Sequence, residues 1–331
     1  MFFWTVRIRR LLAAALCLLI GLTAISIFAV HSRAAEDYIK YVEFNVPYAA
    51  LHKAMEADIA CKGKISWVDT LSYLAAKYGG EWKRYKAADM DALLKKLGNG
   101  EKLDDLTRDM KYFSYFHQAY DAVLGGLLGD YVQELPAGEG KDPVWQARYG
   151  LRAYSPIAEG YYYNDFDDFG ASRTYGFARQ HMGHDLMGSV GTPVIAVESG
   201  TIEIMGWNQY GGWRIGIRSA DKKRYWYYAH LRKDHPFHAD LKEGDSVTAG
   251  QVIGYLGQTG YSRKENVNGI KTPHLHYGLE LVFNEKQKES SNEIWVDLYA
   301  LTRLLSEHRS TVYREDKEFY RKYDMIWCGV E

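Results

Sequence analysis

The sequence predicts an α+β protein of several domains: an N-terminal membrane segment, a helical module, a mainly antiparallel β domain and a C-terminal helix. Three features of the 331-residue chain predict this order. Residues 11–30 carry no charge, and residues 36–135 space their apolar side chains as helices do. Beyond residue 150, short β-prone runs alternate with glycine turns. Outside the membrane segment, the chain is long enough for two domains.

Residues 1–35 are predicted to form a signal-anchor. The basic segment Arg7–Arg10 precedes the uncharged apolar run Leu11–Val30, which is long enough to cross a bilayer. The basic flank should stay in the cytoplasm, which places the body of the protein outside the cell membrane. A cleaved signal peptide is the alternative, because Ala34 and Ala35 provide small residues for cleavage. The protein would then be secreted.

Composition limits the partners and the covalent framework. The formal net charge of −1 gives no sign of a nucleic-acid partner. Cys61 and Cys328 are the cysteines beyond the membrane segment, too few for a disulfide framework. The sequence leaves open whether they pair.

Residues 36–135 are predicted to form a helical module. Ser66–Asp69 resembles a capping box with Asp in place of Glu, and apolar residues at helical spacing continue to Tyr78 before a glycine pair. A second helix is expected over Met90–Leu97 and a third over Leu106–Val123. The sequence does not decide whether this module targets, covers or merely supports the domain that follows.

The character of the chain changes after residue 135. Residues 136–150 are predicted to be a linker because Pro and Gly are frequent there. Residues 286–331 are expected to form a C-terminal helical extension, since leucines between 298 and 305 have helical spacing. Between them, residues 151–285 are predicted to form an antiparallel β domain. Its expected strands are Val194–Val197, Thr201–Met205, Trp213–Ile217, Arg224–Tyr228, Val252–Leu256 and Leu275–Leu281.

Five residues of the β domain have the chemistry of a metal site. They are His181, Asp185, His230, His274 and His276. Two His and one Asp suit zinc and leave a fourth position for water, while two further His can transfer protons. His274 and His276 share one face of a strand, and His181 and Asp185 lie four residues apart with a glycine between them. Chance is the competing explanation, because the chain contains 11 His.

The order and surroundings of these residues resemble the lysostaphin/LytM-type zinc metallopeptidases, which have a duplicated hybrid motif fold. The resemblance covers roughly residues 160–282. The matching pieces are His181–Asp185, Gly191–Val194, Tyr228–Leu231, Gly244–Gly254 and His274–His276.

The resemblance implies a role for each of the five residues. It assigns His181, Asp185 and His276 as ligands of one zinc ion. It also implies that His230 and His274 orient or deprotonate the attacking water and stabilise the oxyanion. The implied fold is a sandwich-like antiparallel sheet with the zinc in a groove.

We therefore expect an extracytoplasmic zinc metalloendopeptidase that cuts peptide stems or cross-bridges of bacterial peptidoglycan. The alternative is a catalytically silent, membrane-anchored scaffold of the same fold that binds cell wall or a partner protein. The segment Tyr163–Phe166 is a candidate for blocking the open zinc position. The loop Tyr261–Pro273 is longer than the link typical of the family, which leaves the substrate preference open.

The remaining His and aromatic residues carry weaker expectations. His184 should face away from its neighbours on an extended segment, as a surface residue or one beside the ligands. His235 and His238 are expected to be solvated in a loop. Several aromatic residues are candidates for lining a groove: Tyr161, Tyr162, Tyr163, Tyr175, Trp207 and Tyr210.

Overall fold

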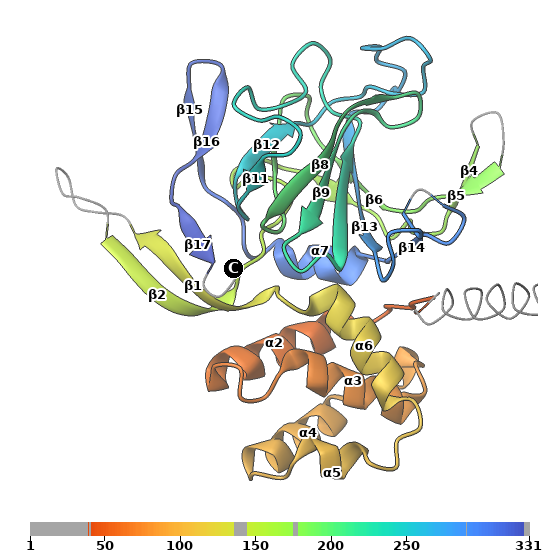
Figure 1. Ribbon diagram of the computed structural model, residues 1–331, viewed down its shortest axis with the longest axis vertical. Helices are drawn as coiled ribbons and strands as arrows, with labels where there is room; N and C mark the ends of the chain where they lie inside the picture. Colours follow the sequence, from red (N-terminus) through yellow and green to blue (C-terminus); the bar gives the residue numbers. More distant parts are fainter. Residues whose placement is uncertain (1–38, 40, 136–143, 175–177, 289, 328–331) are drawn as a thin grey trace, which may run out of the picture. The chain divides into compact units, whose positions relative to one another are not determined.

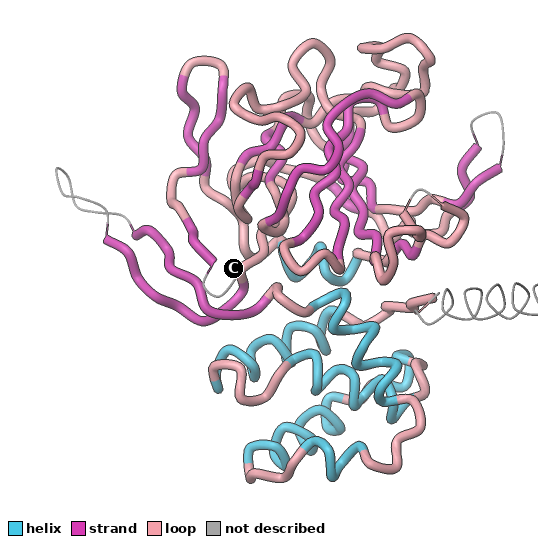
Figure 2. Tube along the Cα trace, in the orientation of Figure 1, coloured by secondary structure: helices cyan, strands magenta, loops and turns pink. Residues whose placement is uncertain are grey.

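The computed structural model describes residues 39, 41–135, 144–174, 178–288 and 290–327. Tyr41–Glu331 form one compact unit, in which helices are followed by β-strands and a short helix (Figures 1 and 2). The expected order of helical and β regions is confirmed. The predicted membrane segment lies outside the described residues. Among those described, no helix has the length and apolarity needed to span a membrane.

The helical region contains five α-helices and one short 3-10 helix. Ser66 is confirmed as the N-cap, since its side chain accepts a hydrogen bond from the backbone N–H of Val68, and Gly79 ends the helix with φ 64°. The prediction of one helix over Leu106–Val123 is wrong, because turns at residues 108–112 divide it. The elements are α2 Tyr48–Cys61, α3 Trp67–Tyr78, η1 Trp82–Arg84, α4 Ala87–Gly98, α5 Leu103–Thr107 and α6 Phe113–Leu124.

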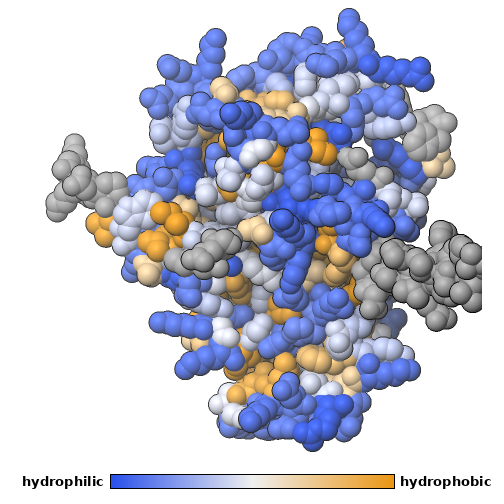
Figure 3. Space-filling view, in the orientation of Figure 1, coloured by the Kyte–Doolittle hydropathy of each residue, from blue (hydrophilic) through white to orange (hydrophobic). Residues whose placement is uncertain are grey.

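A three-stranded sheet includes residues 128–135, for which the prediction of helix is wrong, and part of the predicted linker. Its order is β17–β1–β2, with β1 Leu128–Leu135, β2 Val144–Leu151 and β17 Met325–Trp327. Residues 144–150 of the predicted linker are therefore strand, while residues 136–143 lie outside the described part. Figure 3 shows an apolar patch over this ribbon, where Val144 and Trp145 are exposed.

The C-terminal extension is helical only in part. Helix α7 spans Tyr299–Leu305, close to the predicted leucine stripe. It is followed by the hairpin β15 Val312–Glu315 and β16 Glu318–Arg321, and then by β17. The helical extension predicted for residues 286–331 is confirmed at α7, but it is wrong for the described residues 294–295, 312–315, 318–321 and 325–327, which pair as strands.

The β domain is built on an eight-stranded antiparallel sheet. Its order is β11–β8–β9–β10–β13–β6–β3, with β14 paired to β13. Four of the six predicted strands belong to it, as β8, β9, β10 and β13, and the other two correspond to β7 and β12. The hairpin β4–β5 and the pair β7–β12 lie outside this sheet. The strands are β3 Asn164–Asp165, β4 Ser172–Thr174, β5 Ala178–Gln180, β6 His184–Met187, β7 Pro193–Ile195, β8 Gly200–Asn208, β9 Gly212–Ser219, β10 Arg224–Ala229, β11 Ser246–Val247, β12 Val252–Tyr255, β13 His274–Leu281 and β14 Ile294–Trp295.

One face of the main sheet packs into the core, and the opposite face carries His276. On β13, Leu275, Tyr277 and Leu279 are fully buried, and the Tyr277 hydroxyl bonds to Thr302 of α7. Alternate residues of a strand point to opposite faces, so His276 points away from this core. Because Leu275, Tyr277 and Leu279 face the core, the residues that alternate with them on β13 are the ones that can form the site.

The helical region is tied to the sheet through a buried arginine. Arg224 of β10 is 1% exposed; its Nε and Nη2 donate to Glu198 at 2.8 and 2.9 Å. Its Nη1 donates to the backbone oxygen of Ala122 in α6 at 3.0 Å. The Trp226 indole donates to the same Glu198 carboxylate at 2.8 Å. A buried charge persists only with such partners, so this cluster holds α6 against β10.

Candidate metal centre

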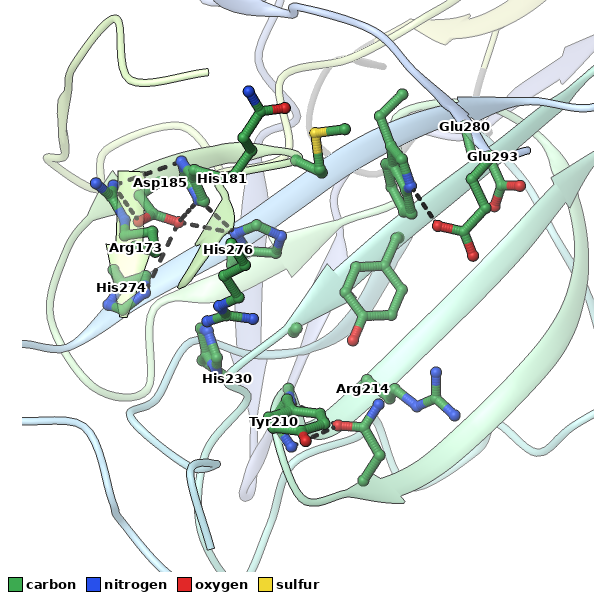
Figure 4. Close-up of a pocket in the computed structure, with 18 of the residues that line it drawn as sticks. Arg173, His181, Asp185, Tyr210, Arg214, His230, His274, His276, Glu280 and Glu293 are labelled. Carbon is green, nitrogen blue, oxygen red and sulfur yellow. Dashed lines mark hydrogen bonds and ion pairs between the residues drawn. The ribbon is translucent and has the colours of Figure 1, made fainter. Parts of the chain in front are cut away.

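Three of the predicted ligands converge on one point. His181 Nε2 lies 3.0 Å from Asp185 Oδ1 and 3.0 Å from His276 Nδ1, and the last two atoms are 2.9 Å apart. Strand pairing produces this arrangement, because β13 and β6 place His276 directly opposite Asp185. Figure 4 shows the three side chains pointing toward one another.

The size of this triangle fits a zinc ion. Atoms about 3.0 Å apart lie about 1.7 Å from their common centre, so an ion about 1.1 Å above their plane would be roughly 2.0–2.1 Å from each. These are the bond lengths of zinc to imidazole nitrogen and carboxylate oxygen. The three residues also form the cluster of potential metal ligands found among the described residues. The donor set and its spacing therefore suit zinc.

Two residues outside the predicted set orient the ligands. His181 Nδ1 lies 3.1 Å from the backbone oxygen and 3.1 Å from the carboxylate Oδ2 of Asp168. Because oxygen here is an acceptor, Nδ1 carries the proton and Nε2 presents its lone pair to the metal. Arg173 bonds to Asp168 Oδ2 and lies 3.6 Å from Asp185 Oδ2, which leaves Asp185 Oδ1 for the metal.

A glycine makes room for the third ligand. A Cβ at Gly183 would lie 2.4 Å from Cε1 and 2.6 Å from Nε2 of His276. Real Cβ atoms essentially never come this close to another heavy atom. The backbone between His181 and Asp185 therefore passes directly beside the His276 ring, as the glycine in the sequence suggested.

The two remaining His have matching orientations. His230 Nδ1 is 2.9 Å from the carbonyl oxygen of Thr259, and His274 Nδ1 is 2.8 Å from that of Thr272. A carbonyl only accepts, so both Nδ1 atoms carry protons and both Nε2 atoms can accept one. The His230 and His274 rings are 4.8 Å apart, and His274 Nε2 is 3.8 Å from Asp185 Oδ1. The structure thus brings all five predicted residues together.

Electrostatics favour the protonation states that a metal site needs. Burial alone would raise the pKa of Asp185, but hydrogen bonds with His181 and His276 and the nearby imidazoles hold it well below its usual value. Burial lowers the pKa of His230 well below its ordinary value, and His274 and His276 add to this effect. His230 also has φ 61°, a left-handed conformation that is uncommon outside glycine. The neutral His230 ring thus lies beside the metal centre on a backbone conformation that residues other than glycine seldom adopt.

Several expectations about other residues need correction. His184 faces away from the ligands, as predicted, but it is 1% exposed and packs against Tyr277 and Tyr299, so it is not a surface residue. His238 is 5% exposed and His235 Nε2 pairs with Glu318 at 2.7 Å, so these two are not freely solvated.

The metal centre opens into a cleft of about 430 Å³. Of the aromatic residues expected to line a groove, Tyr210 does so, Tyr175 lies outside the described residues, and Tyr225, Tyr227 and Trp295 were not anticipated. The long loop contributes Tyr261, whose ring centre is 5.9 Å from that of His230. The segment Tyr163–Phe166 does not line the cleft, because its central residues form β3 at the sheet edge.

The sequence profile described as Peptidase family M23 matches residues 179–290, which contain all five predicted site residues. This segment belongs to peptidase family M23. Within the M23 segment, Asp185 lies on β6 and both His274 and His276 lie on β13, while His181 directly follows β5 and His230 directly follows β10.

Curated relatives match less than half of this chain. The chain is 41% identical over 124 residues to an L-Ala–D-Glu endopeptidase of Bacillus subtilis, which covers 38% of this chain and 36% of the relative. It is 42% identical over 98 residues to lysostaphin of Staphylococcus simulans, which covers 29% of this chain and 17% of lysostaphin. The chain thus spans about a third or less of the length of these relatives.

The fold resemblance extends further than the M23 segment. A crystal structure from Ruminococcus gnavus, of a candidate glycyl-glycine endopeptidase lytM, superposes with a TM-score of 0.57. The superposition covers 82% of this chain and 92% of that one, at 23% identity. Such a likeness shows that most of the described architecture recurs in a solved structure.

Proposed function

We propose that this protein is a zinc metalloendopeptidase that hydrolyses peptide stems or cross-bridges of bacterial peptidoglycan. The convergence of His181, Asp185 and His276 within about 3 Å, beside two further His, carries the proposal. The names of its relatives support it: an L-Ala–D-Glu endopeptidase, lysostaphin and a peptidoglycan DD-endopeptidase of Vibrio cholerae. A scaffold that only binds cell wall would need none of these five side chains at these distances.

The residues of the site divide the chemistry among them. When bound, zinc supplies Lewis-acid activation of a carbonyl and of a water molecule. His181, Asp185 and His276 would hold the ion. His230 and His274 each present a neutral Nε2 that can accept a proton from the attacking water. Once protonated, either ring can donate to the developing oxyanion or to the leaving amine.

The place of action is part of the proposal. The apolar run Leu11–Val30 and its basic flank support a single-pass membrane protein with its body outside the cytoplasm, or a secreted protein if the segment is cleaved. Protease added to intact wall-less cells should then degrade the body of the protein. Protection of the body until the membrane is lysed would contradict this location.

Hydrolysis of defined muropeptides tests the proposal. The purified protein should release peptide products identifiable by mass, lose this activity with a chelator and regain it with zinc. His276→Ala should abolish zinc binding and hydrolysis together, whereas His117→Ala, in the helical region, should change neither. Hydrolysis by metal-free protein would contradict the proposed mechanism.

A further inference from the structure

Two arginines line the cleft beside the metal centre. Arg179 lies on β5 and Arg214 on β9, and both belong to the wall of the cleft. The Nε atoms of both are buried and have no hydrogen-bond acceptor among the described residues. A guanidinium group in a cleft with a buried, unpaired N–H is suited to bind an anion, to which this N–H can donate.

Strand register places Arg214 level with the metal ligands. His276 lies opposite Asp185 on one side and opposite Ala229 on the other. The β10–β9 register pairs Tyr228 with Ile215, so its next step sets Arg214 beside Ala229. With strands about 4.8 Å apart, the Cα atoms of Arg214 and His276 are about 10 Å apart. Arg214, Ala229 and His276 therefore lie side by side on the same face of the sheet.

The other charges of the cleft are engaged or lie elsewhere. Arg173 is paired with Asp168, and Lys288 with Glu203. The carboxylates Glu280 and Glu293 lie together on the side of the cleft away from Asp185, with Arg214 apart from them (Figure 4). A negatively charged ligand group would thus be repelled at that end and attracted toward the arginines.

Both arginines are held in place by tyrosines. Arg179 Nη2 donates to the Tyr261 hydroxyl of the long loop, and its guanidinium lies 5.3 Å from the centre of that ring. Burial raises the pKa of Tyr227, and the neighbouring Arg214 guanidinium acts against this effect. Such contacts restrict the arginine side chains before a ligand arrives, which lowers the entropy lost on binding.

We propose that Arg179 and Arg214 form a subsite for a carboxylate of the substrate. The protein then prefers an acidic stem peptide, with a free carboxylate close to the scissile bond, over an uncharged glycine bridge. Guanidinium and carboxylate groups form paired, charge-assisted hydrogen bonds, which gives the preference its strength. This inference rests on the proposed peptidase function and specifies its substrate class.

Matched peptides test the subsite. The substrates are a synthetic stem peptide, the same peptide with its carboxylates converted to amides, and pentaglycine. We expect kcat/KM to be roughly 10- to 100-fold higher for the acidic peptide than for its amide form, the effect of one hydrogen bond to a charged group. Arg214→Gln and Arg179→Gln should remove most of this preference, measured as a fall in the ratio of kcat/KM for the acidic peptide to kcat/KM for its amide form. Arg214→Lys should keep part of the preference for the acidic peptide that Arg214→Gln loses.

A matched control and a binding measurement complete the design. Arg263→Gln changes an exposed arginine of the same loop that does not line the cleft, and should leave the preference intact. Calorimetry with zinc-free protein should show a higher affinity for the acidic peptide than for its amide form or for pentaglycine. Equal cleavage and equal affinity for the acidic and amide forms would overturn the subsite, as would variants that keep the preference. A protein that binds acidic peptide preferentially but cuts no muropeptide would retain the subsite and refute the peptidase.

Discussion

Replacing Gly183 by alanine should weaken zinc binding while preserving the fold. The new Cβ would lie 2.4 Å from His276 Cε1 and 3.0 Å from the backbone oxygen of Tyr277. Carbon atoms normally approach to about 3.5 Å, so the imidazole must move by about 1 Å. Metal–ligand distances tolerate only about 0.2 Å. The displaced His276 ring can therefore no longer bind zinc as it does when residue 183 is glycine.

The expected loss of zinc affinity is roughly 10- to 100-fold, comparable to the loss of a group that orients a ligand. At saturating zinc this removes about 1.4–2.7 kcal/mol of ligand-derived stability. Competition with a fluorescent chelator measures the affinity, and thermal unfolding with and without zinc measures the stability. Gly206→Ala is the matched control, because an added Cβ there meets nothing within 4 Å. Equal zinc affinity in both variants would refute the argument that Gly183 makes room for His276.

Three further predictions concern the surroundings of the site and the core. Asp168→Asn should lower zinc affinity roughly 10- to 100-fold because His181 loses an anionic acceptor; unchanged affinity in a metal titration would show that the backbone oxygen suffices. Glu198→Ala should lower the free energy of unfolding in urea by about 3–5 kcal/mol, since it leaves Arg224 buried without its carboxylate; a loss below about 1 kcal/mol would contradict this. Burial favours the neutral form of Asp221, but Arg224 and neighbouring hydrogen bonds hold its pKa below the ordinary 3.8. It therefore stabilises the fold above about pH 4 and loses this effect as the pH falls, so Asp221→Asn should flatten the acid side of the stability–pH profile.

The sequence was sufficient to predict the convergence of the ligands. Strand periodicity placed His274 and His276 on one face, and the glycine between His181 and Asp185 indicated a close backbone approach. The resemblance then assigned the three ligands among five candidates. The antiparallel pairing that sets His276 opposite Asp185 is consistent with both arguments. Local spacing and family motifs together were enough to predict that His181, Asp185 and His276 lie close together.

The orienting pair could not be found in the same way. Asp168 and Arg173 precede His181 in a segment without a motif, and backbone hydrogen bonds of the residues between them hold this segment beside His181. Gly170 N–H donates to the His181 oxygen at 2.7 Å, and His181 N–H donates to the Ala171 oxygen at 2.9 Å. Such long-range register has no local sequence signal, so only the folded chain reveals it.

Helix α2 lies in the predicted helical module, but the sequence did not identify it as a separate helix, for a different reason. The buried residues of α2 are Ala50, Leu51, Ala54 and Asp58. Two alanines and a carboxylate make a weak apolar stripe, although Asp58 is satisfied in the fold by the Trp67 N–H at 2.8 Å and the Tyr149 hydroxyl at 2.6 Å. Hydrophobic periodicity cannot recognise a helix whose buried face depends on a distant tyrosine.

Packing, rather than metal binding, fixes the register on which the site depends. A one-residue slip of β13 would move His276 into the core and expose Leu275 and Tyr277, which are now fully buried. Removing two such side chains from the core would cost several kcal/mol, since each contributes about 1.5–3 kcal/mol. The ligands are thus positioned by apolar contacts on the opposite face of the same strand. Zinc would then bind to a preformed triangle, in contrast to small zinc domains whose fold depends on the metal.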